Sequence, residues 1–176
     1  MLKNVINSRD VYDLFHAAPT VFSRLGLRIR HGKQQLVKSA WQHVEASPTN
    51  WWDIPAVRMR WNTLISGSAS VGYHQYLCEK WLKNRSDHLA LSLGCGTGHN
   101  ELIWAKLNKF ERIDAYDLSA PRIQTATKAA AYFGYGNLIR YAVGDVFDVE
   151  VKDSLYDVVV VEQSLHHFSP LDKILK

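Results

Sequence analysis

The sequence has few cysteines and no long hydrophobic run. Cys78 and Cys95 are the only cysteines in 176 residues, which excludes a disulfide framework, and no Cys/His spacing resembles a zinc site. We therefore expect two reduced thiols and no structural metal. No apolar run approaches the roughly 20 residues that span a bilayer, and the start MLKNVINSRD lacks the apolar stretch of a signal peptide. These absences predict a cytoplasmic protein with no membrane contact.

Lysine and arginine do not gather in runs. The formal net charge of +4 is uneven, because basic residues outnumber acidic ones in residues 1–85 and the reverse holds in residues 86–176. A basic region can attract an acidic substrate or nucleic acid, but these charges are scattered singly among Trp, His and Leu. The scatter favours a solvated helical surface and argues against a nucleic-acid partner.

Strand-like alternation is absent from residues 1–85. Helix-like patches lie near residues 11–16, 34–44, 55–65 and 72–82, separated by the loop-like stretches ASPTNWWD and SGSAS. We expect residues 1–85 to form a helical cap or lid whose aromatic side chains pack onto a neighbouring body. The tryptophans of this part are Trp41, Trp51, Trp52, Trp61 and Trp81.

From His88 onward, strand-like and helix-like segments alternate, which predicts βαβ units and a parallel sheet, an α/β fold. Helices are predicted over residues 98–107 and 120–133, the second with Ser119 as its N-cap and Gly134 as its stop. The predicted strands are HLALSL (88–93), RIDAYD (112–117), LIRYAVGD (138–145) and LYDVVVVEQ (155–163).

The fourth predicted strand carries four consecutive valines, which fit a strand buried on both faces. At the edge of a sheet, these side chains would be open to solvent and to aggregation. We therefore expect either a missing C-terminal segment or a partner chain to complete the sheet. A degenerate fragment is the third alternative.

Three glycines, Gly94, Gly96 and Gly98, occupy alternate positions between the first strand and its helix. Glycine lets a backbone approach a ligand closely, and a helix start offers free N–H groups. The dinucleotide fingerprint is G-x-G-x-x-G, yet His99 stands where it needs the third glycine. A nicotinamide oxidoreductase is therefore disfavoured.

The G-x-G-x-G spacing, with Asp117 ending the second strand and GDV after the third, resembles class I S-adenosylmethionine-dependent methyltransferases of the small-molecule type over about residues 88–170. The resemblance implies a Rossmann-like sheet in the order 3-2-1-4, cut off after the fourth strand, with S-adenosyl-L-methionine as cofactor. It further implies that Asp117 accepts from the ribose hydroxyls, that Asp145 accepts from the adenine amino group and that Val146 packs on the ring. The cofactor-binding residues expected on this basis are Gly94, Cys95, Gly96, Gly98, Asp117, Leu118, Asp145, Val146 and Glu162.

Simpler roles stay open for these residues. The glycines suit a tight turn, Asp117 can flank a helix, Asp145 can belong to a turn, and Glu162 can serve only the cap helices. One position departs from the family pattern: Ser92 stands where the family usually carries an acid that helps anchor the cofactor's amino group. Glu101 and Glu162 are candidates to replace that acid.

The stretch EQSLHHF after the fourth strand resembles the loop beside the methyl group in many small-molecule methyltransferases. His166 or His167 can accept a proton from a substrate hydroxyl as the methyl arrives, with steric positioning as the alternative role. No [DN]-P-P-[FYW] stretch follows the fourth strand, which favours a small-molecule acceptor with an O, N or C nucleophile over a nucleobase. The rival hypothesis is a non-catalytic methyltransferase-like binding or scaffold module, as a fragment or subunit.

Overall fold

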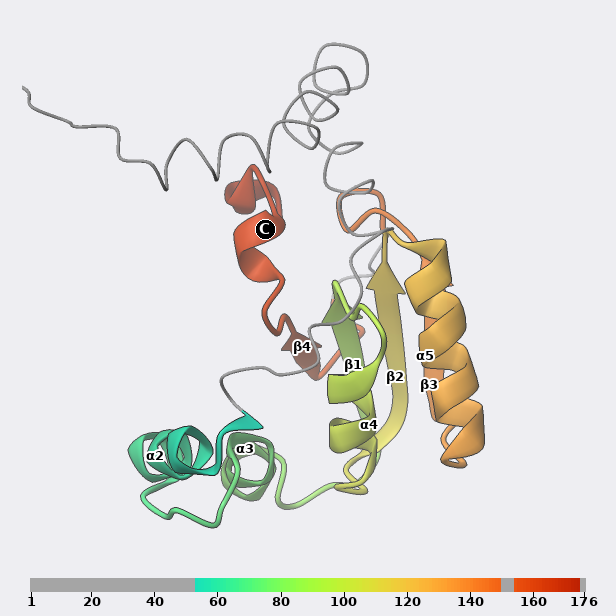
Figure 1. Cartoon of the computed structure of the whole chain (residues 1–176). Coiled ribbons are helices and arrows are strands. Elements are labelled where there is room, and N and C mark those ends of the chain that lie inside the picture. The colour runs from blue at the N-terminus through green and yellow to red at the C-terminus, as the bar shows by residue number, and fades with distance from the viewer. Residues whose placement is uncertain (1–52, 150–153, 175–176) are drawn as a thin grey trace, which may run out of the picture. The chain divides into compact units, whose positions relative to one another are not determined.

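The computed structural model describes residues 53–149 and 154–174, which fall in one compact unit (Figure 1). Within them, two helices precede the sheet, α2 (Pro55–Ser66) and α3 (Tyr73–Trp81), close to the predicted ranges. The prediction that the aromatic side chains of this part are packed away is wrong for Trp61 and Trp81, which are 41% and 69% exposed. The predicted helices near 11–16 and 34–44, and Trp41, Trp51 and Trp52, lie outside the described residues.

Four parallel strands form one sheet in the order β3-β2-β1-β4, which confirms the predicted order. The strands are β1 (His88–Leu93), β2 (Phe110–Asp117), β3 (Ile139–Val143) and β4 (Val158–Val160). β1 has the predicted bounds, whereas β2 begins earlier, at Phe110, which pairs with His88. Because every strand is parallel, their carboxyl ends meet at one edge of the sheet, where the loops that carry the candidate site begin.

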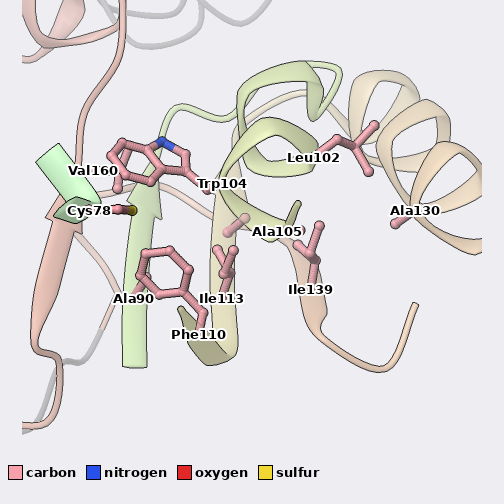
Figure 2. Packing of buried hydrophobic residues seen from close by; sticks show 11 residues of the cluster. Cys78, Ala90, Leu102, Trp104, Ala105, Phe110, Ile113, Ala130, Ile139 and Val160 are labelled. Carbon is pink, nitrogen blue, oxygen red and sulfur yellow. The ribbon is translucent and has the colours of Figure 1, made fainter. Parts of the chain in front are cut away.

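Helices α4 (His99–Ala105) and α5 (Ala120–Tyr132) follow β1 and β2 and pack on one face of the sheet, as Figure 2 shows for their buried side chains. Ala126 and Ala130 lie one turn apart in α5 and are almost fully buried, so this helix approaches the strands closely. Trp104 of α4 meets Phe110 edge-on at 6.0 Å between ring centroids. Burial of each ring contributes about 2–3 kcal/mol to the free energy of unfolding, because it removes apolar surface from water.

The fourth strand differs from its prediction. β4 spans only Val158–Val160 and, among the described strands, lies at the edge of the sheet beside β1. Val160 is buried in the core, but Val159 points to the other face and is 59% exposed. The expectation that the valines are buried on both faces is therefore wrong, because successive side chains of a strand alternate and only one face of β4 meets the core.

The start of α5 also needs a correction. Ser119 occupies the predicted N-cap position, but its hydroxyl makes no capping hydrogen bond and is fully buried without a partner in the part of the chain that the structure describes. The N–H of Ser119 instead donates to Asp117 Oδ1 at 2.8 Å. After β4, short 3-10 helices cover Leu165–His167 (η2) and Leu171–Lys173 (η3). None of the helices in the described ranges is long and apolar enough to cross a membrane.

Candidate functional site

The glycine loop, residues 94–98, joins β1 to α4 and needs glycine for two separate reasons. Gly94, Gly96 and Gly98 all have positive φ angles, of 74°, 57° and 79°. A Cβ on Gly94 would lie 2.5 Å from Cβ of Ser164, and one on Gly98 would overlap the hydroxyl of Tyr141. Only Gly96 is less crowded, because its Cβ would meet the end of the flexible Arg122 side chain at 3.3 Å.

The amides of this loop are bonded largely within the protein. Gly94 and Cys95 both donate to the carbonyl of Tyr116, at 2.8 and 3.1 Å, and Gly98 donates to the carbonyl of Cys95 at 3.0 Å. Gly96 donates to Asp117 Oδ2 at 2.9 Å. The sequence-based expectation of free amides is therefore wrong for these four residues, because the end of β2 accepts from three of them and the loop itself accepts from Gly98.

Asp117 is held by two backbone amides. Oδ2 accepts from Gly96 and Oδ1 accepts from Ser119, the residue just before α5. A carboxylate has about four lone-pair sites, so each oxygen still has room for a further donor such as a hydroxyl. Asp117 and its neighbour Leu118 are both half-buried, beside the glycine loop as the sequence predicts.

The end of β3 lies beside Asp117. The N–H of Gly144 donates to the backbone carbonyl of Asp117 at 3.1 Å, which brings Asp145 and Val146 to the same edge of the sheet. Asp145 Oδ1 accepts from the N–H of Phe147 at 3.0 Å, the pattern of a turn. Asp145 thus makes the turn contact that the sequence left open, and its second oxygen has no protein donor among the described residues.

Glu162, just after β4, contacts the helices rather than the glycine loop. Its Oε2 accepts from the hydroxyl of Tyr73 at 2.6 Å and its Oε1 accepts from Nε1 of Trp104 at 2.7 Å. His74 Nε2 lies 3.2 Å from the same Oε1, an ion pair when the imidazole is protonated. Burial raises the pKa of Glu162, but these neighbours outweigh burial and leave that pKa below its usual value. Both carboxylate oxygens are therefore engaged by α3 and α4.

Ser92 and Glu101 form a buried pair behind the glycine loop. Ser92 Oγ donates to Glu101 Oε1 at 2.6 Å, and the two residues are 3% and 2% exposed. Burial raises the pKa of Glu101 to about 7, although the bond from Ser92 partly opposes this shift. Ser92, which stands where the family pattern has an acid, therefore contacts the carboxyl group of Glu101 from α4.

The two candidate catalytic histidines lie together in η2. The rings of His166 and His167 are 3.8 Å apart between centroids and are tilted by 47°. Burial lowers the pKa of His167, and His166 lowers it further. Their segment is joined to the glycine loop by Ser164, whose Oγ donates to the carbonyl of Leu93 at 2.7 Å and whose side chain packs against Gly94.

Several residues around the site have no role in the sequence-based prediction. Trp104 and His74 complete the contacts of Glu162, and Ser164 and Tyr141 pack against the glycines. Trp104 had one usable signal, since it lies three residues after Glu101 and thus on the same side of α4. Ser164 and Tyr141 had none, because each is separated from its glycine by a long stretch of chain.

Residues 91–176 match the family described as "Methyltransferase domain". This segment belongs to the methyltransferase-domain family. The match begins within β1 and includes every residue predicted above to bind cofactor or to act in catalysis. The cofactor of this family is S-adenosylmethionine.

Solved structures share the fold of this methyltransferase domain. Geranyl diphosphate C-methyltransferase from Streptomyces coelicolor A3(2), crystallised with Mg²⁺, geranyl diphosphate and S-adenosyl-L-homocysteine, matches with a TM-score of 0.53 and 13% identity over 82% of this chain and 59% of its own. The [4+2]-cyclase SpnF matches with a TM-score of 0.53 and 18% identity, over 74% of this chain and 42% of its own. YcgJ from Bacillus subtilis matches with a TM-score of 0.50 and 24% identity, over 56% of this chain and 41% of its own. The chain thus spans less than two thirds of the length of each.

Proposed function

We propose that the chain is an S-adenosylmethionine-dependent methyltransferase acting on an O, N or C nucleophile of a small molecule. The observation that carries the proposal is the pairing of Asp117 with the Gly96 amide. This bond holds a carboxylate with free lone pairs beside a glycine bend, next to Asp145. That arrangement suits an adenosine, which offers two ribose hydroxyls and an exocyclic amine as donors.

The residues present also fit the cofactor in three other respects. Glu101 Oε2 and the Ser119 hydroxyl are buried without hydrogen-bond partners in residues 53–149 and 154–174, which is unusual unless a further group binds nearby. Gly96 carries no side chain where the loop passes Asp117, so a ligand there meets bare backbone. The carboxylates of Glu162 and Asp117 both act electrostatically on Glu101, and this concentration of negative charge favours a cationic ligand.

The cofactor supplies a methyl group bonded to a positively charged sulfur, ready for in-line displacement. The protein's share of the reaction is to position both reactants and exclude water, which together lower most of the barrier. Asp117, Leu118, Asp145 and Val146 orient the adenosine end. The lowered pKa of His167 favours the neutral ring near pH 7, the form in which an imidazole can accept the proton of an acceptor hydroxyl.

A non-catalytic binding or scaffold module is the second candidate. The observation that favours it is the edge position of β4, where Val159 is 59% exposed beside an unpaired strand edge. A partner chain or a further segment of the same protein would complete the sheet there. The cyclase SpnF shares the fold, so the fold by itself does not require methyl transfer to be the reaction.

Calorimetric titration of the chain separates these candidates. We expect saturable binding of S-adenosylmethionine and S-adenosylhomocysteine, and no binding of NAD⁺. No heat and no shift in melting temperature with the first two ligands would favour the scaffold, whereas saturable NAD⁺ binding would favour an oxidoreductase. If the ligands bind, formation of S-adenosylhomocysteine in mixtures of candidate small-molecule acceptors tests the transfer step itself.

A further inference from the structure

Glu101 presents an unusual combination of burial and incomplete bonding. The residue is 2% exposed, and its Oε1 accepts from Ser92 at 2.6 Å. Its Oε2 is buried without any hydrogen-bond partner among the described residues. A buried acceptor without a partner is destabilising, and a buried carboxylate is more so unless a cation compensates it.

The surroundings of Glu101 supply no such cation. The acidic groups Glu162 and Asp117 act on its carboxyl and raise its pKa further, so they oppose its ionised form. The titratable groups coupled to it lie on α3, the glycine loop, β2, β3 and the segment after β4: Tyr73, Cys95, Asp117, Tyr141 and Glu162. None of these groups is positively charged at neutral pH, so an ionised Glu101 has no cationic partner among them, and a cationic ligand would supply one.

We propose that Glu101 binds the amino group at the amino-acid end of the cofactor, in place of an acid at position 92. This inference rests on the proposed function, which supplies a ligand that carries both an ammonium and a sulfonium. The ammonium is the group that fits, because it has N–H donors for the free Oε2 and a sulfonium has none. Ser92 then keeps Oε1 in place by its hydrogen bond, which fixes the carboxylate and leaves Oε2 as the acceptor without a donor in the described part of the chain.

The Ser92–Glu101 contact suggests a direct exchange experiment. Ser92 is on β1 and Glu101 on α4, yet their side chains touch, so an acid can be moved from one element to the other within the same space. In the double variant Ser92→Asp/Glu101→Gln, the introduced carboxylate accepts from the introduced amide. The pair keeps one hydrogen bond, and the negative charge moves from position 101 of α4 to position 92 of β1. Glu111→Gln is the matched control, since Glu111 is an exposed acid on β2.

The first readout is the dissociation constant of S-adenosylhomocysteine, measured by calorimetry for each chain. We expect Glu101→Gln to weaken binding about 10- to 100-fold, the effect of one charge-assisted hydrogen bond. The double variant should regain most of the affinity, and Glu111→Gln should bind as the wild type does. Melting temperatures without ligand show that each variant is folded.

The second readout is the number of protons released on binding, obtained by repeating the titration in buffers of different ionisation enthalpy. The pKa of Glu101 is about 7 in the free protein, and an ammonium partner would lower it. At pH 7 the wild type should therefore release about half a proton more than Glu101→Gln does. A buried acid with only a structural role would show no such difference.

The outcomes separate this inference from the proposed function. Equal affinity and equal proton release in the wild type and Glu101→Gln would overturn the role of Glu101 while leaving the methyltransferase proposal intact. Failure of the folded double variant to regain affinity would overturn the replacement of an acid at position 92. A wild-type chain that binds neither S-adenosylmethionine nor S-adenosylhomocysteine would overturn both proposals.

Discussion

Tyr73 donates a hydrogen bond from its hydroxyl to Glu162 Oε2 at 2.6 Å, across 89 positions of the sequence. The bond links α3, which precedes the sheet, to the segment that follows β4. Trp104 of α4 donates to the other oxygen of the same carboxylate, so three elements meet at one side chain. The conformation of the segment that carries His166 and His167 therefore depends in part on a helix that precedes the sheet.

We expect Glu162→Gln to lower the free energy of unfolding by about 1–3 kcal/mol, because a side-chain amide has one acceptor oxygen for two buried donors. Tyr73→Phe should cost about 1 kcal/mol, since it removes one hydrogen bond and leaves Trp104 paired. Urea denaturation of both variants and of the double variant measures the coupling between the two residues. Strictly additive effects would show that the bond does not contribute to stability; Glu111→Gln provides the control for loss of an acid.

Gly98 and Gly134 are a matched pair for measuring how much steric crowding of an added Cβ lowers the free energy of unfolding. Their φ angles are 79° and 80°, but a Cβ on Gly98 would strike Tyr141 and Ala126, whereas one on Gly134 would meet nothing within 4 Å. Gly134→Ala should therefore cost only the backbone strain of about 1–2 kcal/mol. Gly98→Ala should cost at least about 1 kcal/mol more. Equal losses in urea denaturation would contradict the packing of the glycine loop described above.

The buried carboxyl of Glu101 predicts a pH dependence of stability. Its pKa rises from 4.5 to about 7 on folding, so the folded state binds more protons between these values. The contribution to stability is thus fully present below pH 4.5 and is lost as the pH rises through about 7. Its full size is about 3 kcal/mol, from 1.4 kcal/mol per pKa unit.

Denaturation of the wild type and of Glu101→Gln at several pH values between about 5 and 8 checks this dependence, and the slope that differs between them belongs to Glu101. Glu162 does not interfere, because its pKa is lowered on folding and its contribution is lost at more acidic pH. If the two curves run parallel throughout, the carboxyl does not titrate in this range.

Asp117→Asn tests the contact on which the proposed function depends most. The variant keeps one acceptor oxygen for two backbone donors, the amides of Gly96 and Ser119, so it disturbs the loop and α5 together. We expect affinity for S-adenosylhomocysteine to fall about 10- to 100-fold in calorimetry, with a loss of stability of about 1–2 kcal/mol. Asp148→Asn, at an exposed acid after β3, should change neither quantity. Wild-type affinity in Asp117→Asn would exclude a ribose contact.

Local patterns in the sequence were sufficient to predict the elements of the sheet, and the family resemblance supplied their order. The apolar run of β1, the glycines of the loop and the helix-forming stretch of α5 each predict an element from neighbouring residues, and the structure confirms the order of the four strands. Asp117 and Asp145 could be placed near the loop for the same reason, since parallel strands bring their carboxyl ends to one edge. The prediction that the four valines are buried on both faces was wrong, because a run of valines does not reveal whether its strand lies in the middle or at the edge of a sheet.

The arrangement of partners around the acids depended on the tertiary structure alone. The sequence shows Ser92 without its expected acid, and only the packing of α4 on β1 brings Glu101 to it. In the same way, Glu162 acquires Tyr73 and Trp104 from segments that are distant in the chain. The sequence by itself determined the alternation of strands and helices and the glycine bend, because these follow from local conformational preference and hydrophobic pattern, whereas the strand order came from the family resemblance. Only the tertiary structure decided which carboxyls are bonded, buried or incompletely satisfied, because hydrogen bonding and desolvation depend on neighbours that the linear order does not specify.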